Sequence, residues 1–356
     1  MVRIAHISDS HLGSSLFQLT ERREDARKCL KKAVEMAMRH SPDILVHTGD
    51  LYDSHFPSVE DQNFTTKLFK ELSKKLPVVV LQGNHDMPFG YRYHSSPVRT
   101  LENAEFVIST GDKPTKVEKI ECDGKEIELH LISWANHFVF TRFLDTTTPE
   151  TDDAFFFAHD IPVRKENLPI HFQYYGFGHG HNFWLDEEYS IGRTGSTCIV
   201  DWRKEMGGNK RLIVVDADNE NIEFTTETLN DTREFKFLTG LDISGMGPSE
   251  ANVSIKNSLT RLSPKKEKPI VILQVNGIID AETEDGIQRT ELLKYGEKHL
   301  HPLFIHIEPN WVCSGSRKID LSDPLNIQKS VEEYIEQTGT PDNESILSML
   351  QEIVEG

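Results

Sequence analysis

The chain has 356 residues, of which 37% are hydrophobic and 27% are charged, a composition typical of a folded globular protein large enough for more than one domain. Its formal net charge of −18 excludes a histone-like protein that holds nucleic acid by bulk positive charge. The four cysteines lie far apart and form no C-x-x-C pair, which argues against a disulfide framework and a thiolate zinc site. Because the N-terminus reaches a charged residue early and no apolar run is long enough to span a bilayer, we expect an intracellular protein without a membrane partner.

The first hundred residues alternate short apolar runs with amphipathic stretches. The runs at 2–7, 44–47 and 78–81 predict buried strands, and apolar residues at helical spacing predict helices over 21–39 and 59–75. This order predicts parallel strands with helices packed on the sheet, and hence an α/β fold. The same segment carries 14 basic and 12 acidic residues, so it is the part of the chain that we expect to face a polyanion.

Short strands continue beyond this segment, and a second unit begins near residue 235. The further strands of the first part are expected at 106–108, 116–120, 127–132, 154–158, 174–178, 190–193, 212–215 and 222–226. In the second unit, helices are expected at 249–262 and 286–295, and strands at 270–275 and 303–307. After residue 324 the pattern predicts a hairpin of two amphipathic helices whose apolar residues need a partner surface.

Polar side chains with metal-binding atoms follow five of the predicted strands. They are Asp9, His11, Asp50, Asn84, His85, His159, His179 and His181. Ligands of open α/β sheets bind beyond the carboxyl ends of the strands, so these side chains can converge on one site. Carboxylate, amide and imidazole groups without a thiolate suit manganese, iron or zinc. Each block alone is explained as well by a turn, a cap or surface histidines, but the five blocks together predict a metal centre.

The ordered blocks D-x-H, G-D, G-N-H-D, H and G-H-x-H resemble those of the calcineurin-like binuclear metallophosphoesterases. The resemblance implies a β-sandwich flanked by helices, an α+β sandwich that holds two metal ions. It implies that one ion is held by Asp9, His11 and His181, and the other by Asn84, His159 and His179. Asp50 would bridge the two ions.

The resemblance also implies a catalytic role for a histidine that does not bind metal. His85, next to the ligand Asn84, would neutralise developing charge or give a proton to the leaving oxygen. Asp86 is a candidate for orienting the His85 ring, and a plain turn residue is the alternative interpretation.

Within this superfamily, several segments are similar to the SbcD-type DNA repair nucleases, also called the meiotic-recombination-eleven family. They are residues 4–13, 46–53, 81–88 and 195–197. The similarity implies a nuclease domain over 1–235, a small α/β DNA-capping domain over 236–322, and a helical segment over 323–356. In that family the helical segment docks on the coiled-coil base of an ABC-type ATPase subunit.

This resemblance implies a nuclease of double-strand-break repair that uses two Mn²⁺ ions per chain, with Mg²⁺, Fe²⁺ or Zn²⁺ as alternatives. The implied activities are 3′–5′ exonuclease on double-stranded DNA and endonuclease on single-stranded DNA, in a cytoplasmic, nucleoid-associated homodimer if the source is prokaryotic. Asp53 is a candidate support of the site and also a departure from the pattern, because many members have histidine at this position while others have aspartate. In the family this residue is linked to positioning DNA for exonuclease action. The strength of the exonuclease therefore stays open.

Contacts to DNA cannot be assigned from motifs. Arg22, Arg92 and Arg99 flank the site loops and are candidate phosphate contacts, with ordinary solvated surface charge as the alternative. Two other functions compete with a DNA nuclease: a phosphatase or phosphodiesterase of small substrates, and a non-catalytic scaffold. The long chain beyond the predicted metal domain disfavours the first, and the complete set of predicted ligands disfavours the second.

Overall fold

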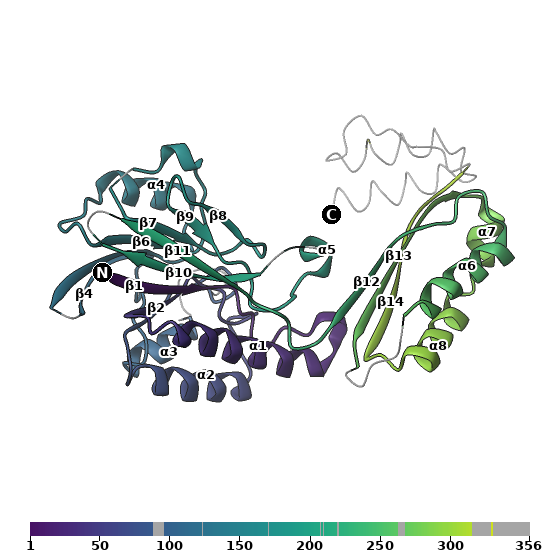
Figure 1. Ribbon diagram of the computed structural model, residues 1–356, viewed down its shortest axis with the longest axis horizontal. Helices are drawn as coiled ribbons and strands as arrows, with labels where there is room; N and C mark the ends of the chain where they lie inside the picture. Colours follow the sequence, from purple (N-terminus) through teal and green to yellow (C-terminus); the bar gives the residue numbers. More distant parts are fainter. Residues whose placement is uncertain are drawn as a thin grey trace. The chain divides into compact units, whose positions relative to one another are not determined.

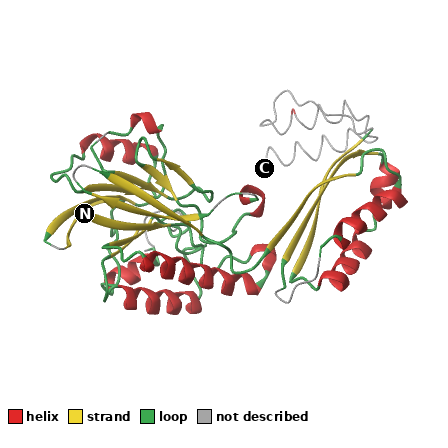
Figure 2. Cartoon of the chain, viewed as in Figure 1, coloured by secondary structure: helices red, strands yellow, loops and turns green. Residues whose placement is uncertain are grey.

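The computed structural model describes residues 1–87, 96–122, 124–169, 171–206, 208, 210–218, 221–262, 268–314 and 329. The chain divides into two compact units, Met1–Thr232 and Arg233–Gly356, whose helices and strands are shown in Figures 1 and 2. No helix within the described ranges is both long enough and apolar enough to cross a membrane.

The first unit contains two β-sheets. Its five-stranded sheet has the order β11-β10-β1-β2-β3, formed by β1 (Val2–Ile7), β2 (Ile44–His47), β3 (Val78–Val80), β10 (Arg211–Ala217) and β11 (Ile222–Thr228). The strands β1, β2 and β3 pair in parallel, as the alternation of strands and helices in the sequence predicts. The strands β10 and β11 extend this sheet by antiparallel pairing.

The second sheet of this unit has six strands in the order β4-β5-β6-β7-β9-β8. They are β4 (Thr115–Cys122), β5 (Lys125–Ile132), β6 (Ala154–Ala158), β7 (Tyr174–Phe177), β8 (Trp184–Asp186) and β9 (Ile191–Arg193). The strands β5, β6, β7 and β9 run parallel, so the carboxyl ends of β6 and β7 lie at one edge of the sheet.

Helices cover the outer faces of the two sheets. The helices and short 3-10 turns are η1 (Leu16–Gln18), α1 (Thr20–Arg39), α2 (Val59–Leu72), α3 (Val98–Asn103), α4 (His137–Thr146), η2 (Lys165–Asn167) and α5 (Trp202–Glu205). Alternate residues of β1 face opposite sides: Ile4 packs with Phe157 between the sheets, and Ala5 packs with α1. On the far side, Phe140 of α4 packs on Phe156. Figure 1 shows α1, α2 and α3 on one side of the unit and α4 on the other, which confirms the expected α/β sandwich.

One predicted strand is absent from the described part of this unit, and the short elements α3, α4, α5 and β8 were not predicted. Residues 106–108 form no regular strand, and only an isolated bridge joins Val79 to Ile108. The helix α4 was not expected from the sequence. Only Phe140 and Leu144 of its ten residues are buried, so the apolar pattern that would predict a helix consists of a single i, i+4 pair. The clearest sign of its N-terminus is Asn136, whose side chain accepts a hydrogen bond from the backbone N–H of Val139.

The second unit is a parallel three-stranded sheet with helices. The sheet has the order β12-β13-β14, formed by β12 (Phe235–Asp242), β13 (Ile270–Ile279) and β14 (Phe304–Cys313). Its helices are α6 (Pro248–Thr260), α7 (Ala281–Gly286) and α8 (Arg289–Leu300), which Figure 2 shows along the sheet. They bury Ile255 and Leu292 against the sheet residue Leu273.

The helix expected over 286–295 is present as α8, but it begins later, at Arg289, because the extended Ile287 separates it from the short helix α7. The helical hairpin expected after residue 324 lies outside the described residues, apart from residue 329. The roles of the second unit in DNA capping and of residues 323–356 in partner binding therefore stay predictions.

Candidate metal centre

The predicted site residues lie at the carboxyl ends of parallel strands. Asp9 and His11 follow β1, Asp50 follows β2, Asn84 and His85 follow β3, His159 follows β6, and His179 and His181 follow β7. Three of these strands belong to one sheet and two to the other. Because both sheets direct these ends toward the same edge of the sandwich, side chains far apart in the sequence become neighbours.

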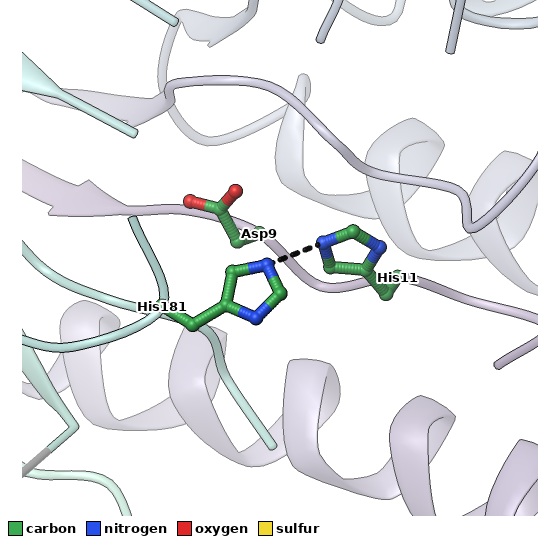
Figure 3. A group of neighbouring side chains, drawn as sticks. All are labelled: Asp9, His11 and His181. Atoms are coloured by element: carbon green, nitrogen blue, oxygen red, sulfur yellow. Dashed lines mark hydrogen bonds between the residues drawn. The ribbon is translucent and has the colours of Figure 1, made fainter. Parts of the chain in front are cut away.

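Asp9, His11 and His181 form the first group of converging side chains. Ligand atoms of these three residues lie within 4.8 Å of one another. Figure 3 shows the group, with the Nε2 atoms of His11 and His181 facing each other at 3.1 Å. The structure thus brings together the three residues predicted to hold one metal ion.

Asp50, His159 and His179 form a second group, also within 4.8 Å. Asn84 completes it, since its Oδ1 lies 3.0 Å from Nε2 of His159 and 2.9 Å from Nδ1 of His179. Asp50 also reaches the first group: its Oδ2 lies 3.4 Å from Nε2 of His159 and 3.7 Å from Nε2 of His11. This carboxylate therefore occupies the position expected of a bridging ligand.

The chemistry of these side chains fits a pair of divalent cations. Oδ2 of Asp9 is buried and has no hydrogen-bond partner, which is costly for a carboxylate unless a cation neutralises it. The Nε2 atoms of His11 and His181 approach each other as two ligands of one ion do. Carboxylate and amide oxygens mixed with imidazole nitrogens are the ligands that Mn²⁺, Fe²⁺ and Zn²⁺ accept.

Strong electrostatic coupling accompanies this arrangement. Burial lowers the pKa of His159, but the Asp50 and Asp9 carboxylates outweigh burial and raise this pKa to about 9. Burial raises the pKa of Asp50, but His159 and His11 outweigh it and hold this pKa far below its usual range. The site thus attracts positive charge, and cation binding is expected to release protons from its imidazoles.

Three of the imidazoles are oriented by a hydrogen bond at the nitrogen that faces away from the pocket. Nδ1 of His159 donates to the carbonyl of Thr48 at 2.8 Å. Nδ1 of His11 lies 3.1 Å from Oδ1 of Asp53, and Nδ1 of His181 lies 2.9 Å from Oε1 of Glu205. Such partners fix which nitrogen is protonated and leave the other as a ligand. Asp53 was expected as support, whereas sequence analysis missed Glu205, which follows His181 by 24 residues with no motif between them.

His85 lies beside the two groups. Its backbone N–H donates to Oδ1 of Asp50 at 2.8 Å, and its ring packs edge-on against His11 with centroids 4.7 Å apart. The ring is exposed, and its Nδ1 lies 2.9 Å from the carbonyl oxygen of Asp53. Since that oxygen only accepts, Nδ1 is the hydrogen-bond donor. Nε2 is then the nitrogen available to a substrate.

The expectation that Asp86 orients the His85 ring is wrong. The Asp86 carboxylate is fully buried and accepts hydrogen bonds from the backbone N–H groups of Leu51, Tyr52 and Gly83. It therefore ties the loop after β2 to the loop after β3. The backbone carbonyl of Asp53 orients the His85 ring instead.

The candidate DNA contacts have different outcomes. Arg22 is 2% exposed, and its guanidinium is held by both oxygens of Asp231 and by Asp25, so it is not available to DNA and this expectation is corrected. Arg99 is paired with Glu102 and Asp112, and its role toward DNA stays a prediction. Arg92 lies outside the described residues.

A profile of the calcineurin-like phosphoesterase family matches residues 2–190, and the chain belongs to this family. Members depend on a binuclear metal centre, so the protein is a metal-dependent phosphodiesterase, and the two ligand groups described above agree with this class. A third group of converging side chains, His11, Asp53 and His85, shares His11 with the first group.

Comparison with curated proteins identifies relatives within this family. Three of them are described as "DNA double-strand break repair protein Mre11". The relative from Thermoplasma acidophilum is 26% identical over 78% of this chain and 78% of its own length. The relative from Sulfolobus acidocaldarius is 24% identical over 84% of this chain and 81% of its own length. The relative from Methanosarcina acetivorans is 34% identical over 79% of this chain but only 46% of its own length. These similarities confirm the resemblance to the SbcD-type family that the motifs indicated.

Proposed function

We propose that this protein is a manganese-dependent nuclease of DNA double-strand-break repair, with 3′–5′ exonuclease activity on double-stranded DNA and endonuclease activity on single-stranded DNA. The observation that carries the proposal is the Asp50 carboxylate, which lies between two groups of converging ligands. The description of the relatives as DNA double-strand break repair proteins supports DNA as the substrate. The metal ligands proposed are Asp9, His11, Asp50, Asn84, His159, His179 and His181.

When bound, two divalent cations supply Lewis acidity toward the phosphoryl oxygens and a strong nucleophile at neutral pH. The side chains of this protein contribute orientation and proton transfer. Asp50 fixes the spacing of the two ligand groups, because its Oδ2 lies within 3.7 Å of an imidazole nitrogen from each of them. His85 holds a proton on Nδ1 through the carbonyl of Asp53, so Nε2 is the atom that contacts the substrate. A proton carried on Nε2 would pass to the oxygen that leaves phosphorus.

The proposal also includes partners. The segment 323–356 would bind a coiled-coil ABC-type ATPase, and the chain would act as a homodimer. Deleting residues 324–356 should spare nuclease activity and abolish binding of the ATPase subunit in a pull-down assay. Unchanged binding by the truncated chain would refute the role of this segment. Light scattering of the intact chain tests the dimer, which a monomeric mass would exclude.

Cleavage assays test the catalytic proposal. The purified protein is incubated with Mn²⁺ and with labelled single-stranded DNA, double-stranded DNA or bis-p-nitrophenyl phosphate. We expect cleavage of DNA, whereas hydrolysis of the small ester alone would favour a phosphodiesterase of small substrates. No hydrolysis of any of these would favour a non-catalytic scaffold.

The variant His85→Ala tests the assigned role of this histidine. It should bind two Mn²⁺ ions like the wild type yet lose about 10²–10⁴-fold in cleavage rate, the usual contribution of a general acid. The exposed His171 offers a matched control, since His171→Ala should keep both properties. Loss of bound metal in His85→Ala would show that His85 is a ligand and that its role is assigned wrongly.

A further inference from the structure

A buried carboxylate lies directly behind one of the proposed metal ligands. Glu205 is the last residue of α5 and is 2% exposed. Its Oε1 lies 2.9 Å from Nδ1 of His181 and accepts from the backbone N–H groups of Val200 at 3.0 Å and Asp201 at 2.6 Å. Because an ionised carboxylate only accepts, Nδ1 of His181 is the donor, and the lone pair of Nε2 faces His11 in the pocket.

The second oxygen of Glu205 is also fully engaged. The ammonium group of Lys210 donates to Oε2, and the hydroxyl of Ser196 lies 3.0 Å from the same oxygen. Lys210 is only 6% exposed, and its Nζ is also 3.4 Å from the carbonyl oxygen of His181. Both oxygens are therefore fixed by partners from several segments, and the carboxylate cannot rotate away from His181 without losing them.

We propose that Glu205 is a positioning residue that holds the His181 ring in the orientation and tautomer that bind a metal ion, with Lys210 as its buried counter-charge. The inference rests on the proposed function, in which His181 is a ligand. A carboxylate behind a ligating imidazole fixes the ring and makes its other nitrogen a better donor. The pair Asp53 and His11 repeats this arrangement, but the Asp53 side chain is 34% exposed. Glu205 is thus the more rigid of the two supports.

A purely structural role for Glu205 is the competing explanation. The same carboxylate forms a buried ion pair with Lys210, and breaking such a pair by removing one partner is strongly destabilising. A single substitution would therefore lower stability under either explanation. The two explanations differ in which nitrogen of His181 they expect to carry the proton. They also differ in the metal affinity that they expect of two variants that are equally stable.

A pair of double variants separates the two roles. The first, the amide variant, combines Glu205→Gln with Lys210→Met; it removes both charges but keeps an amide oxygen that accepts from His181. The second, the apolar variant, combines Glu205→Leu with Lys210→Met and removes the acceptor as well. Neither variant leaves the charge of Glu205 or Lys210 buried alone. The two variants differ in the acceptor at position 205, which serves His181 and the backbone N–H groups of Val200 and Asp201. Only its contact with His181 bears on the tautomer of that ring. Glu128→Leu is the control for folding, because Glu128 is equally buried and forms a carboxylate–imidazole pair with His130 outside the site.

Two measurements read the outcome. Calorimetric titration with Mn²⁺ should show that one of the two ions binds about 10–100-fold more weakly to the apolar variant than to the amide variant. Nitrogen-15 NMR of the labelled histidines, without added metal, should show the proton of His181 on Nδ1 in the wild type and in the amide variant. That assignment should be lost in the apolar variant, and Glu128→Leu should match the wild type in both measurements.

Equal Mn²⁺ affinity in the two double variants, or an unchanged His181 tautomer, would overturn the positioning role. This outcome is distinct from failure of the proposed function. If the wild type bound no pair of ions or cleaved no DNA, the proposed function would fall, while the tautomer of His181 would still decide whether Glu205 orients the ring.

Discussion

Replacing Gly49 by alanine should disturb both the fold and the metal site. The structure allows its cost in stability to be divided into a backbone part and a packing part. Gly49 has φ +107°, a conformation that L side chains rarely adopt. A Cβ there would also overlap the His159 ring and lie 3.0 Å from the backbone nitrogen of Gly83. We expect a cost of about 1–2 kcal/mol from the backbone conformation and about 1–3 kcal/mol from overpacking.

Gly124 provides the matched control. It also has a positive φ, +77°, but a Cβ there meets nothing within 4 Å, so Gly124→Ala carries the conformational cost alone. In a domain of this size, thermal unfolding should shift by roughly 2–4 °C for each kcal/mol. We therefore expect Gly49→Ala to unfold several degrees below Gly124→Ala. The steric explanation is refuted if the two variants unfold at the same temperature.

The Gly49 variant should also lose metal affinity. The displaced His159 ring would weaken its 2.8 Å hydrogen bond to the carbonyl of Thr48, which orients it. Calorimetry with Mn²⁺ should show weaker binding in Gly49→Ala than in Gly124→Ala. Equal affinity would mean that His159 recovers its position by relaxation of the loop, and that the close approach of Gly49 does not set the geometry of this ligand.

Three further predictions test other parts of the first unit. Arg22→Met should destabilise the fold by about 3–5 kcal/mol in urea unfolding, because it removes a buried partner of Asp231, and DNA affinity of the folded variant should be unchanged. Asp53→Ala should weaken Mn²⁺ binding about 10–100-fold in calorimetry, since His11 loses its side-chain partner, while the backbone carbonyl that holds His85 remains. Burial and the nearby His47 lower the pKa of His6 to about 3. As the pH falls, the His6 imidazole therefore binds a proton in the unfolded state before it does so in the folded state. The stability that is present above pH 6.5 should then be lost progressively as the pH falls toward 3. Urea unfolding of the metal-free protein between pH 7 and 4 should be less pH-dependent in His6→Gln, and an equal dependence would contradict the assignment.

The sequence predicted the site well because its signal is local. Each block directly follows a short buried run, as Asp50 follows β2 and His159 follows β6. Buried runs of this kind predict parallel strands, and parallel strands bring their carboxyl ends to one edge of a sheet. Strand order explains proximity within one sheet, such as that of His11 and Asp50. His11 and His181 follow strands of different sheets, so their approach also depends on how the two sheets pack, and the sequence indicated it only through the family resemblance.

The parts that were missed depend on contacts that no local pattern encodes. Arg22 sits on an amphipathic helix like a surface residue, but its partner Asp231 is 209 positions away. Asp86 is adjacent to His85, yet the turn after β3 directs its carboxylate to backbone N–H groups rather than to that ring. Glu205 belongs to a four-residue helix without a motif, and only the folded loop places it behind a ligand.

Backbone strain explains why the ligand blocks need such extensive support. Asp9, His11, Asp50 and His179 have φ values of 51°, 44°, 50° and 63°, in the left-handed region where an L-residue costs roughly 1–2 kcal/mol. Four such residues together cost roughly 4–8 kcal/mol, comparable with the lower half of the stability of an ordinary domain, about 5–15 kcal/mol. The strain is offset by hydrogen bonds between the loops, such as those from Asp9 N to the carbonyl of Gly49 and from His11 N to the carbonyl of Asp50, both 3.0 Å. The loops that hold the ligands are therefore stabilised by one another, and a change in one block should affect ligands in the others.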